Sequence, residues 1–117
     1  MTPEHLASLM YHTQFRFSSE ADLQEAIEAL YVQNGVSYVR EARLNAKDRI
    51  DFMVGGIGVE VKVDSSLNSV QRQLWRYAAS DAIDSLVLVT TKAAHKNLPE
   101  FITGKPLYVV HLLHSFF

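Results

Sequence analysis

The sequence predicts an α/β fold in which helices flank a mixed β-sheet. Three consecutive segments between residues 36 and 63 alternate apolar and polar side chains with the period of two that is typical of strands. Segments with helical periodicity lie on both sides of this region. After the helical segment at residues 66–81, residues 84–91 form an almost uninterrupted apolar run, which indicates a strand that is buried on both faces.

Two helices are expected ahead of the strands. Residues 3–12 favour a short helix, and residues 18–35 favour a longer one. In the longer helix, either serine of the pair at 18–19 can cap the start, acidic residues crowd the first turn, and Asn34-Gly35 ends it. Its apolar stripe consists of Leu23, Ala26, Ile27 and Leu30.

The rest of the chain alternates strands with helical segments. Three antiparallel strands are predicted at residues 36–44, 49–54 and 57–63. A helix over residues 66–81 then leads to the buried strand, and a helix between two strands indicates a right-handed crossover. A helical turn at 93–98 and a last strand at 106–113 complete the order.

Length and composition favour one compact domain over residues 1–117. The chain is 48% hydrophobic, which is enough for an adequate core. It contains no cysteine, which excludes disulfides and thiolate zinc sites and fits a reducing compartment. Neither a leader with a basic start nor a run of about 18 apolar residues is present, so we expect a cytoplasmic protein with no membrane partner.

Charge is distributed unevenly along the chain, although the net charge is only −2. Residues 1–39 carry one arginine and five acidic residues, whereas residues 40–76 carry seven cationic and five acidic residues. A globally basic nucleic-acid binder is therefore excluded, and the middle third is where a polyanion would be tolerated.

The stretch DRIDFMVGGIGVEVKV gathers charged side chains on one face of a predicted hairpin. If its glycine pair at 55–56 forms a two-residue turn, Asp51 lies opposite Glu60 and Arg49 lies opposite Lys62. Opposed like charges destabilise a strand pair, and a divalent cation between the two carboxylates would make their proximity stabilising instead. The residues expected on the other, buried face are Ile50, Phe52, Val59, Val61 and Val63.

Two other interpretations of this hairpin stay open. In the first, Asp51 with Lys62 and Arg49 with Glu60 form diagonal pairs in a solvated charge lattice. In the second, a four-residue loop over residues 55–58 pairs Asp51 with Lys62, which weakens the case for a metal.

These residues resemble the motif of the PD-(D/E)XK nuclease superfamily. Asp51 corresponds to the motif's aspartate, and "EVK" supplies Glu60 and Lys62. On the following helix, "QLWRY" places Gln73 and Tyr77 at the Q-x-x-x-Y spacing of the RecB-type and Holliday-junction-resolvase-like branches. The resemblance implies a restriction-endonuclease-like αβββαβ core and a prokaryotic or phage origin.

The resemblance covers the chain from about residue 18 to residue 112, with two departures. Ile50 replaces the proline before the motif's aspartate, a substitution that the superfamily often shows. The strongly basic face of many DNA-cutting members is missing.

A glutamate on the first helix completes the site in many members of the superfamily. Of the three candidates Glu20, Glu25 and Glu28, only Glu20 borders the apolar stripe of its helix. The alternative is that Glu20 is only an acid in a first helical turn, where the helix dipole favours it.

The resemblance implies a Mg²⁺-dependent DNA nuclease, an endonuclease rather than an exonuclease. Such an enzyme hydrolyses phosphodiester bonds with Mg²⁺-activated water and leaves 5′-phosphate ends. The implied metal ligands are Asp51, Glu60, the backbone carbonyl of Val61 and Glu20, and Mn²⁺ can substitute for Mg²⁺. Lys62 would contact the attacking water or the scissile phosphate, and Gln73 and Tyr77 would lean toward the site.

The expected partner is double-stranded or branched DNA, bound by Arg40, Arg43, Arg72 and Arg76. So short a basic track makes few phosphate contacts, which favours a homodimer. The apolar end YVVHLLHSFF either pairs chains or closes the core, and Trp75 either stacks on a base or packs against protein. The alternative function is a catalytically inactive nuclease-fold module that serves as a DNA-binding or assembly subunit.

No zinc site is expected from the five histidines. His5 and His12 lie on a terminal helix, while His111 and His114 are three residues apart in a strand and so face opposite ways.

Overall fold

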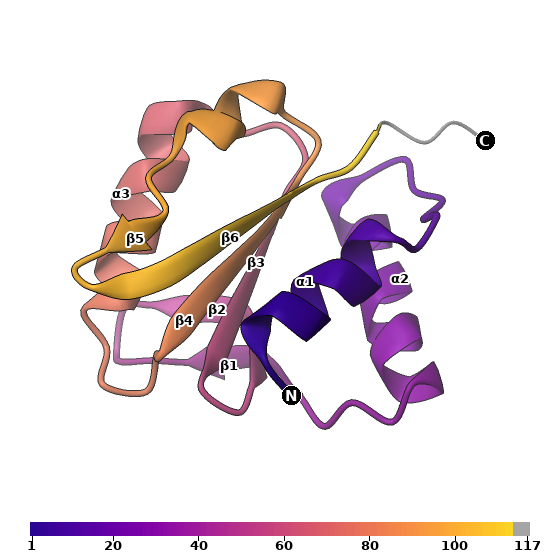
Figure 1. Ribbon diagram of the computed structural model, residues 1–117, viewed down its shortest axis with the longest axis horizontal. Coiled ribbons are helices and arrows are strands. Elements are labelled where there is room, and N and C mark those ends of the chain that lie inside the picture. Colours follow the sequence, from indigo (N-terminus) through magenta and orange to yellow (C-terminus); the bar gives the residue numbers. More distant parts are fainter. Residues whose placement is uncertain (114–117) are drawn as a thin grey trace.

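A mixed β-sheet with helices on both faces forms the protein (Figure 1). The structure is a computed structural model, and it describes residues 1–113. Within these residues the sheet has six strands in the order β1-β2-β3-β4-β6-β5. The strands are β1 (Val39–Arg43), β2 (Arg49–Val54), β3 (Ile57–Lys62), β4 (Ser85–Thr90), β5 (Phe101–Ile102) and β6 (Lys105–His111). The helices are α1 (Pro3–Tyr11), α2 (Glu20–Gln33), α3 (Leu67–Ala78) and the 3₁₀-helix η1 (Ala93–Asn97). The predicted α/β fold with a mixed, helix-flanked sheet is confirmed.

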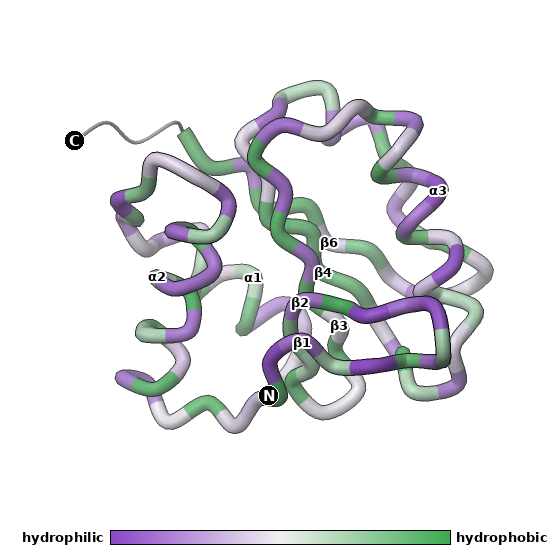
Figure 2. Tube along the Cα trace, turned by 180° about the vertical axis from the view of Figure 1, so that it is seen from behind, coloured by the Kyte–Doolittle hydropathy of each residue, from purple (hydrophilic) through white to green (hydrophobic). Residues whose placement is uncertain are grey.

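Two hydrophobic clusters pack against the two faces of the sheet. Helices α1 and α2 cover one face, where Leu23 and Ile27 pack with alternate residues of β3 and β4. Helix α3 covers the other face through Val70 and Leu74. Every residue of β4 is buried, as the apolar run predicts, because its alternate side chains enter the two clusters. Figure 2 shows hydrophobic residues along β4 and β6 in the middle of the sheet.

The ends of α2 follow its capping residues. Ser19 is the N-cap, and its hydroxyl accepts a hydrogen bond of 3.1 Å from the backbone N–H of Asp22. Asn34 is the C-cap, and Gly35 follows it with φ +67°, a left-handed conformation that suits glycine. The second of the two candidate serines therefore caps α2, and the helix stops where the sequence predicts.

The β2–β3 hairpin has the two-residue turn that the sequence favours. Phe52 lies opposite Val59, and Val54 lies opposite Ile57 across the glycine pair. The four-residue loop is thereby excluded, and Gly55 adopts φ +60°, which a turn of this kind requires. Strand β1 pairs with β2 in antiparallel order, and β3 pairs with β4 in parallel order through the connection that contains α3.

One residue of the hairpin points to a different face than predicted. Ile50 packs in the cluster under α3, whereas Phe52, two residues later, packs under α1 and α2. A Cβ on Gly58 would approach Ile50 Cδ1 to 2.6 Å, so glycine makes room for this side chain. Strand β2 thus changes face at the intervening residue, Asp51, and the expectation that Ile50 shares the face of Phe52 is wrong.

The C-terminal part of the sheet contains a strand that the sequence does not predict. The short β5 pairs with β6 in antiparallel order, and β6 pairs with β4 in parallel order. Because β6 lies between two strands and buries Leu107 and Val110, this segment closes the core. His114 and the residues after it lie outside the described part of the chain. No helix within residues 1–113 is long and apolar enough to cross a membrane.

Candidate active site

Strands β2 and β3 separate where the motif carboxylates lie. The ladder between them runs from the turn to the pair Phe52–Val59 and does not continue to the next pair. There the backbone N–H of Asp51 donates to Glu60 Oε1 at 3.2 Å, and the N–H of Val61 donates to Asp51 Oδ2 at 2.8 Å. Two side-chain carboxylates therefore take the place of backbone carbonyls between the strands.

Glu20 reaches the same region from the first turn of α2. Its Oε1 accepts a hydrogen bond of 3.1 Å from the N–H of Val63, the residue that follows β3. Burial is the main cause that raises the pKa of Asp51, and the charge of Glu20 adds a smaller part to this shift. The structure thus brings Glu20 to the motif residues.

Lys62 and the Q-x-x-x-Y pair surround Glu60. Lys62 Nζ lies 3.1 Å from Glu60 Oε2, and the Tyr77 hydroxyl lies 3.2 Å from the same oxygen. Gln73 Nε2 donates to the Tyr77 hydroxyl at 2.7 Å, and that hydroxyl also lies 3.1 Å from the carbonyl oxygen of Arg49. The inner face of α3 therefore ties both strands of the hairpin together. The solvated charge lattice is not formed, because Glu60 is buried and Arg49 lies 3.9 Å from Glu41 instead of pairing with Glu60.

Burial raises the pKa of both hairpin carboxyls. The Glu60 side chain is 3% exposed, and burial together with the charge of Asp51 raises the pKa of Glu60 to about 8, although Lys62 opposes the shift. Burial also raises the pKa of Asp51, against the hydrogen bond from Val61 and the charge of Lys62. Holding both groups ionised is therefore unfavourable without additional positive charge.

The donor set fits a magnesium ion in its chemistry. All the candidate ligands are hard oxygens, which Mg²⁺ prefers. Among the described residues every buried polar side-chain atom except Arg40 Nε has a hydrogen-bond partner. Within residues 1–113, Asp51 Oδ1 and Glu20 Oε2 accept no hydrogen bond, and neither is among the fully buried oxygens that lack a partner.

The carboxylates do not form a ready-made metal cluster. No group of three or more acidic or histidine side chains within residues 1–113 is arranged to hold an ion. Both oxygens of Glu60 are occupied by internal partners, Asp51 N–H on one side and Tyr77 with Lys62 on the other. Glu60 would therefore have to give up one of these partners to bind a cation.

Two of the four arginines expected to bind DNA lie together on the outer face of α3. Arg72 and Arg76 are both exposed there, and Arg76 Nε donates to Asp48 Oδ1 at 3.1 Å. Arg43 is exposed at the end of β1, and its guanidinium lies 3.4 Å from the carbonyl oxygen of Ala46.

Arg40 lies on the opposite face of the sheet from the two arginines of α3. Its guanidinium pairs with Glu25 at 3.1 Å and Glu28 at 2.9 Å on α2, and it lies 5.9 Å from the centre of the Phe52 ring. The predicted track of four arginines is therefore not formed, because α2 supplies two carboxylates that hold Arg40.

His95 is a buried polar residue that sequence reasoning missed. Its Nδ1 lies 2.6 Å from the Thr90 hydroxyl, and its Nε2 lies 2.9 Å from the carbonyl oxygen of Ser65. A ring protonated on Nε2 donates to Ser65 and accepts from Thr90. His95 thereby fastens the loop after β3 to the end of β4. A single histidine in a short helical turn gives no pattern from which this contact could be predicted.

Comparisons with protein-family models, curated proteins and solved structures gave no match. Function is therefore inferred from the chemistry of the side chains that meet where β2 and β3 separate.

We expect Tyr77→Phe to destabilise the fold. The hydroxyl is buried, and its removal leaves Gln73 Nε2 and Glu60 Oε2 each without one hydrogen bond. The cost should be about 1–3 kcal/mol, measured by urea unfolding. Tyr11→Phe is the control because that side chain is exposed. Equal stability of the two variants would contradict the importance of this hydroxyl.

Proposed function

We propose that this protein is a Mg²⁺-dependent DNA endonuclease with a restriction-endonuclease-like core of the PD-(D/E)XK type. One observation carries the proposal: carboxylates from three elements converge with a lysine where β2 and β3 separate. Glu20 comes from α2, Asp51 from β2, and Glu60 with Lys62 from β3. A chance occurrence of the motif would not explain why Glu20, distant in sequence, reaches the same point.

Each residue has a role in hydrolysis under this proposal. Asp51, Glu60, the Val61 carbonyl and Glu20 would hold Mg²⁺, which when bound would offset the charge of the phosphate and lower the pKa of a water molecule. Lys62 Nζ donates to the attacking water or to a phosphate oxygen. Water attacks phosphorus, the bond to the 3′-oxygen breaks, and that oxygen takes up a proton to leave a 3′-hydroxyl and a 5′-phosphate.

Tyr77 and Gln73 act as positioning residues for Glu60. The Tyr77 hydroxyl contacts Glu60 Oε2, and Gln73 fixes that hydroxyl through its own hydrogen bond. This chain of contacts leads from α3 to the carboxylate and limits the orientations that Glu60 adopts.

The direct test is cleavage of supercoiled plasmid and of branched oligonucleotides by the purified full chain. We expect nicking that requires Mg²⁺ or Mn²⁺, stops with a chelator, and leaves ends that ligase accepts after annealing. Products with 3′-phosphate ends, or cleavage that persists with excess chelator, would contradict the proposed chemistry.

A second candidate function is a nuclease-fold module that binds DNA without cutting it. Two observations favour it: both Glu60 oxygens are engaged internally, and the described carboxylates form no ready-made metal cluster. DNA binding with no cleavage under any divalent metal would select this alternative.

We expect Glu20→Gln to lower the cleavage rate by about ten-fold or more, the usual cost of disturbing a metal site. The amide still accepts from the Val63 N–H, so the fold is retained while the charge is lost. Glu25→Gln is the matched control, because Glu25 lies on the same helix, is 69% exposed and pairs with Arg40. Equal cleavage rates for the two variants would remove Glu20 from the site.

A further inference from the structure

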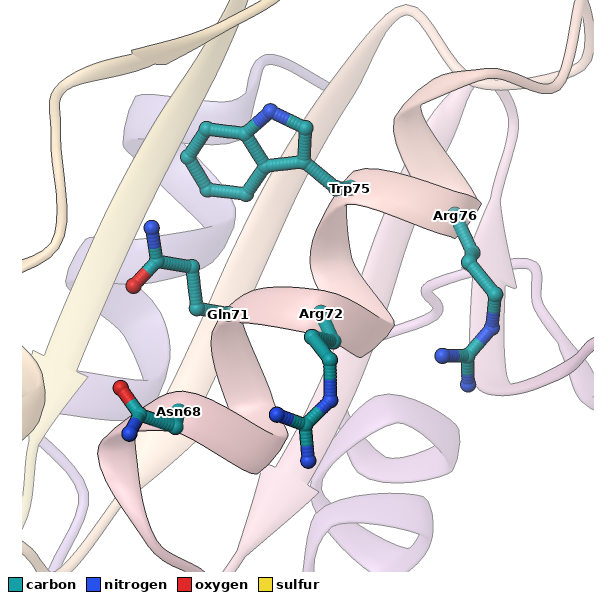
Figure 3. Close-up of a pocket in the computed structure, with 5 residues that line it drawn as sticks. All are labelled: Asn68, Gln71, Arg72, Trp75 and Arg76. Atoms are coloured by element: carbon teal, nitrogen blue, oxygen red, sulfur yellow. The ribbon is translucent and has the colours of Figure 1, made fainter.

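The outer face of α3 lines a groove that the hydrolytic roles do not use. Its volume is about 630 Å³, within the range of pockets that hold ligands. The lining side chains are Asn68, Gln71, Arg72, Trp75 and Arg76, which share one helix face by their spacing of three and four residues. Figure 3 shows the indole and the two amides along one side and the two guanidinium groups along the other.

The groove is cationic and contains no carboxylate among its lining residues. Helix α3 has no acidic residue along its whole length. Arg72 forms no ion pair with any described residue, so its charge is available to a ligand. Arg76 is held by Asp48 but stays more than half exposed. These charges suit an anionic ligand with phosphate groups.

Trp75 gives the groove an aromatic wall. Its side chain is partly buried against the cluster under α3, which fixes the indole, and the remaining part lines the groove. A fixed indole next to guanidinium groups is the combination that binds a base and its phosphate in single strands. The exposed amides of Asn68 and Gln71 can donate to and accept from base edges.

The groove and the candidate active site share helix α3. Tyr77, which contacts Glu60, follows Arg76 in the sequence, and Arg76 contacts Asp48 just before β2. The inner face of α3 thus contacts the carboxylates through Tyr77, and its outer face lines the groove.

We propose that this groove binds an unpaired segment of the DNA substrate, with a base against Trp75 and its phosphates at Arg72 and Arg76. This inference rests on the proposed function and narrows its substrate to DNA with a single-stranded arm, flap or end. Bases within a duplex are stacked on one another, so an indole at the rim of a groove meets only an unpaired base.

Trp75 fluorescence reports directly on this groove, because the chain contains one tryptophan. The full chain is titrated, in chelator to prevent cleavage, with a short oligothymidine and with a blunt duplex of equal length, while fluorescence anisotropy of labelled DNA measures total binding. We expect the oligothymidine to quench the indole at a concentration about ten-fold lower than the duplex does. Quenching by the duplex at an equal or lower concentration, or DNA binding without quenching, would overturn the proposal.

The charge of the groove is tested with a matched pair of variants. Arg72→Gln should weaken oligothymidine binding about ten-fold, whereas Arg16→Gln should leave it unchanged. Arg16 is exposed between α1 and α2, on the other side of the sheet, and its replacement changes the net charge equally. Equal losses in the two variants would overturn the groove as the binding site.

The outcomes separate the two proposals. If the protein cleaves DNA but the fluorescence assay shows no preference for unpaired strands, the proposed role of the groove is rejected and the nuclease proposal is kept. If oligothymidine binds at Trp75 but no DNA is cleaved, the proposed role of the groove is kept and the nuclease proposal is rejected.

Discussion

Glu60→Gln is expected to make the protein more stable above pH 8, not less. In the folded chain Glu60 is buried next to Asp51, and the pKa of its carboxyl is raised from 4.5 to about 8. At about 1.4 kcal/mol for each pKa unit, ionising Glu60 in the fold costs several kilocalories per mole. Glutamine carries no charge and keeps an acceptor for the Asp51 N–H, so it avoids this cost.

The sign of the pH dependence follows from proton binding. Between about pH 4.5 and pH 8 the folded state holds the Glu60 proton more tightly than the unfolded state does, so wild-type stability falls as the pH rises through this interval. The raised pKa of Asp51 acts in the same direction. The variant does not lose stability through ionisation of Glu60. Its stability relative to wild type therefore rises across this pH interval and reaches its full value above pH 8.

Thermal unfolding at several pH values measures the effect. We expect the variant to melt at least about 5 °C above wild type at pH values above 8, and close to wild type below pH 4.5. Glu100→Gln is the control, because this exposed residue takes no part in the site. A variant less stable than wild type above pH 8 would show that the Glu60 carboxylate stabilises the fold.

Lys62→Ala and Glu60→Gln are each expected to lower Mg²⁺-dependent cleavage by about 100-fold or more, the usual cost of removing one group that stabilises a charged transition state. Lys62 is the cation paired with Glu60 at 3.1 Å, and its side chain is 15% exposed, so it faces the site and still reaches solvent. Its removal takes away the donor proposed to hold the attacking water or the phosphate.

Lys47→Ala is the control for lost positive charge, since Lys47 is exposed in the loop before β2. Circular dichroism checks that each variant is folded. Wild-type cleavage by folded Lys62→Ala would exclude Lys62 from the mechanism.

The hairpin turn and the buried strand β4 could be predicted because local rules decide them. The glycine pair at 55–56 selects the two-residue turn, and the turn then sets which residues of β2 and β3 lie opposite. The apolar run in β4 is long enough to require burial on both faces. The position of Glu20 at the edge of an apolar stripe is also a local property of the sequence, and it predicts that this side chain lies near the sheet, as its contact with Val63 shows.

The features that escaped prediction depend on contacts between distant elements. Strand periodicity assumes that side chains alternate without interruption, so it predicts Ile50 and Phe52 on the same face. It does not reveal that β2 changes face at Asp51. The charge pattern likewise placed Arg40 in a DNA-binding track, because it does not show that α2 brings Glu25 and Glu28 to the same point.

Three backbone amides donate to carboxylates instead of to backbone carbonyls, so their hydrogens report on the state of those carboxylates. The amides of Asp51, Val61 and Val63 donate to the side chains of Glu60, Asp51 and Glu20. A regular ladder would give such amides permanent acceptors, whereas a carboxylate can rotate or take up a proton and leave its amide unprotected. Solvent hydrogen exchange at these three amides is thereby coupled to the rotation and protonation of the three acids.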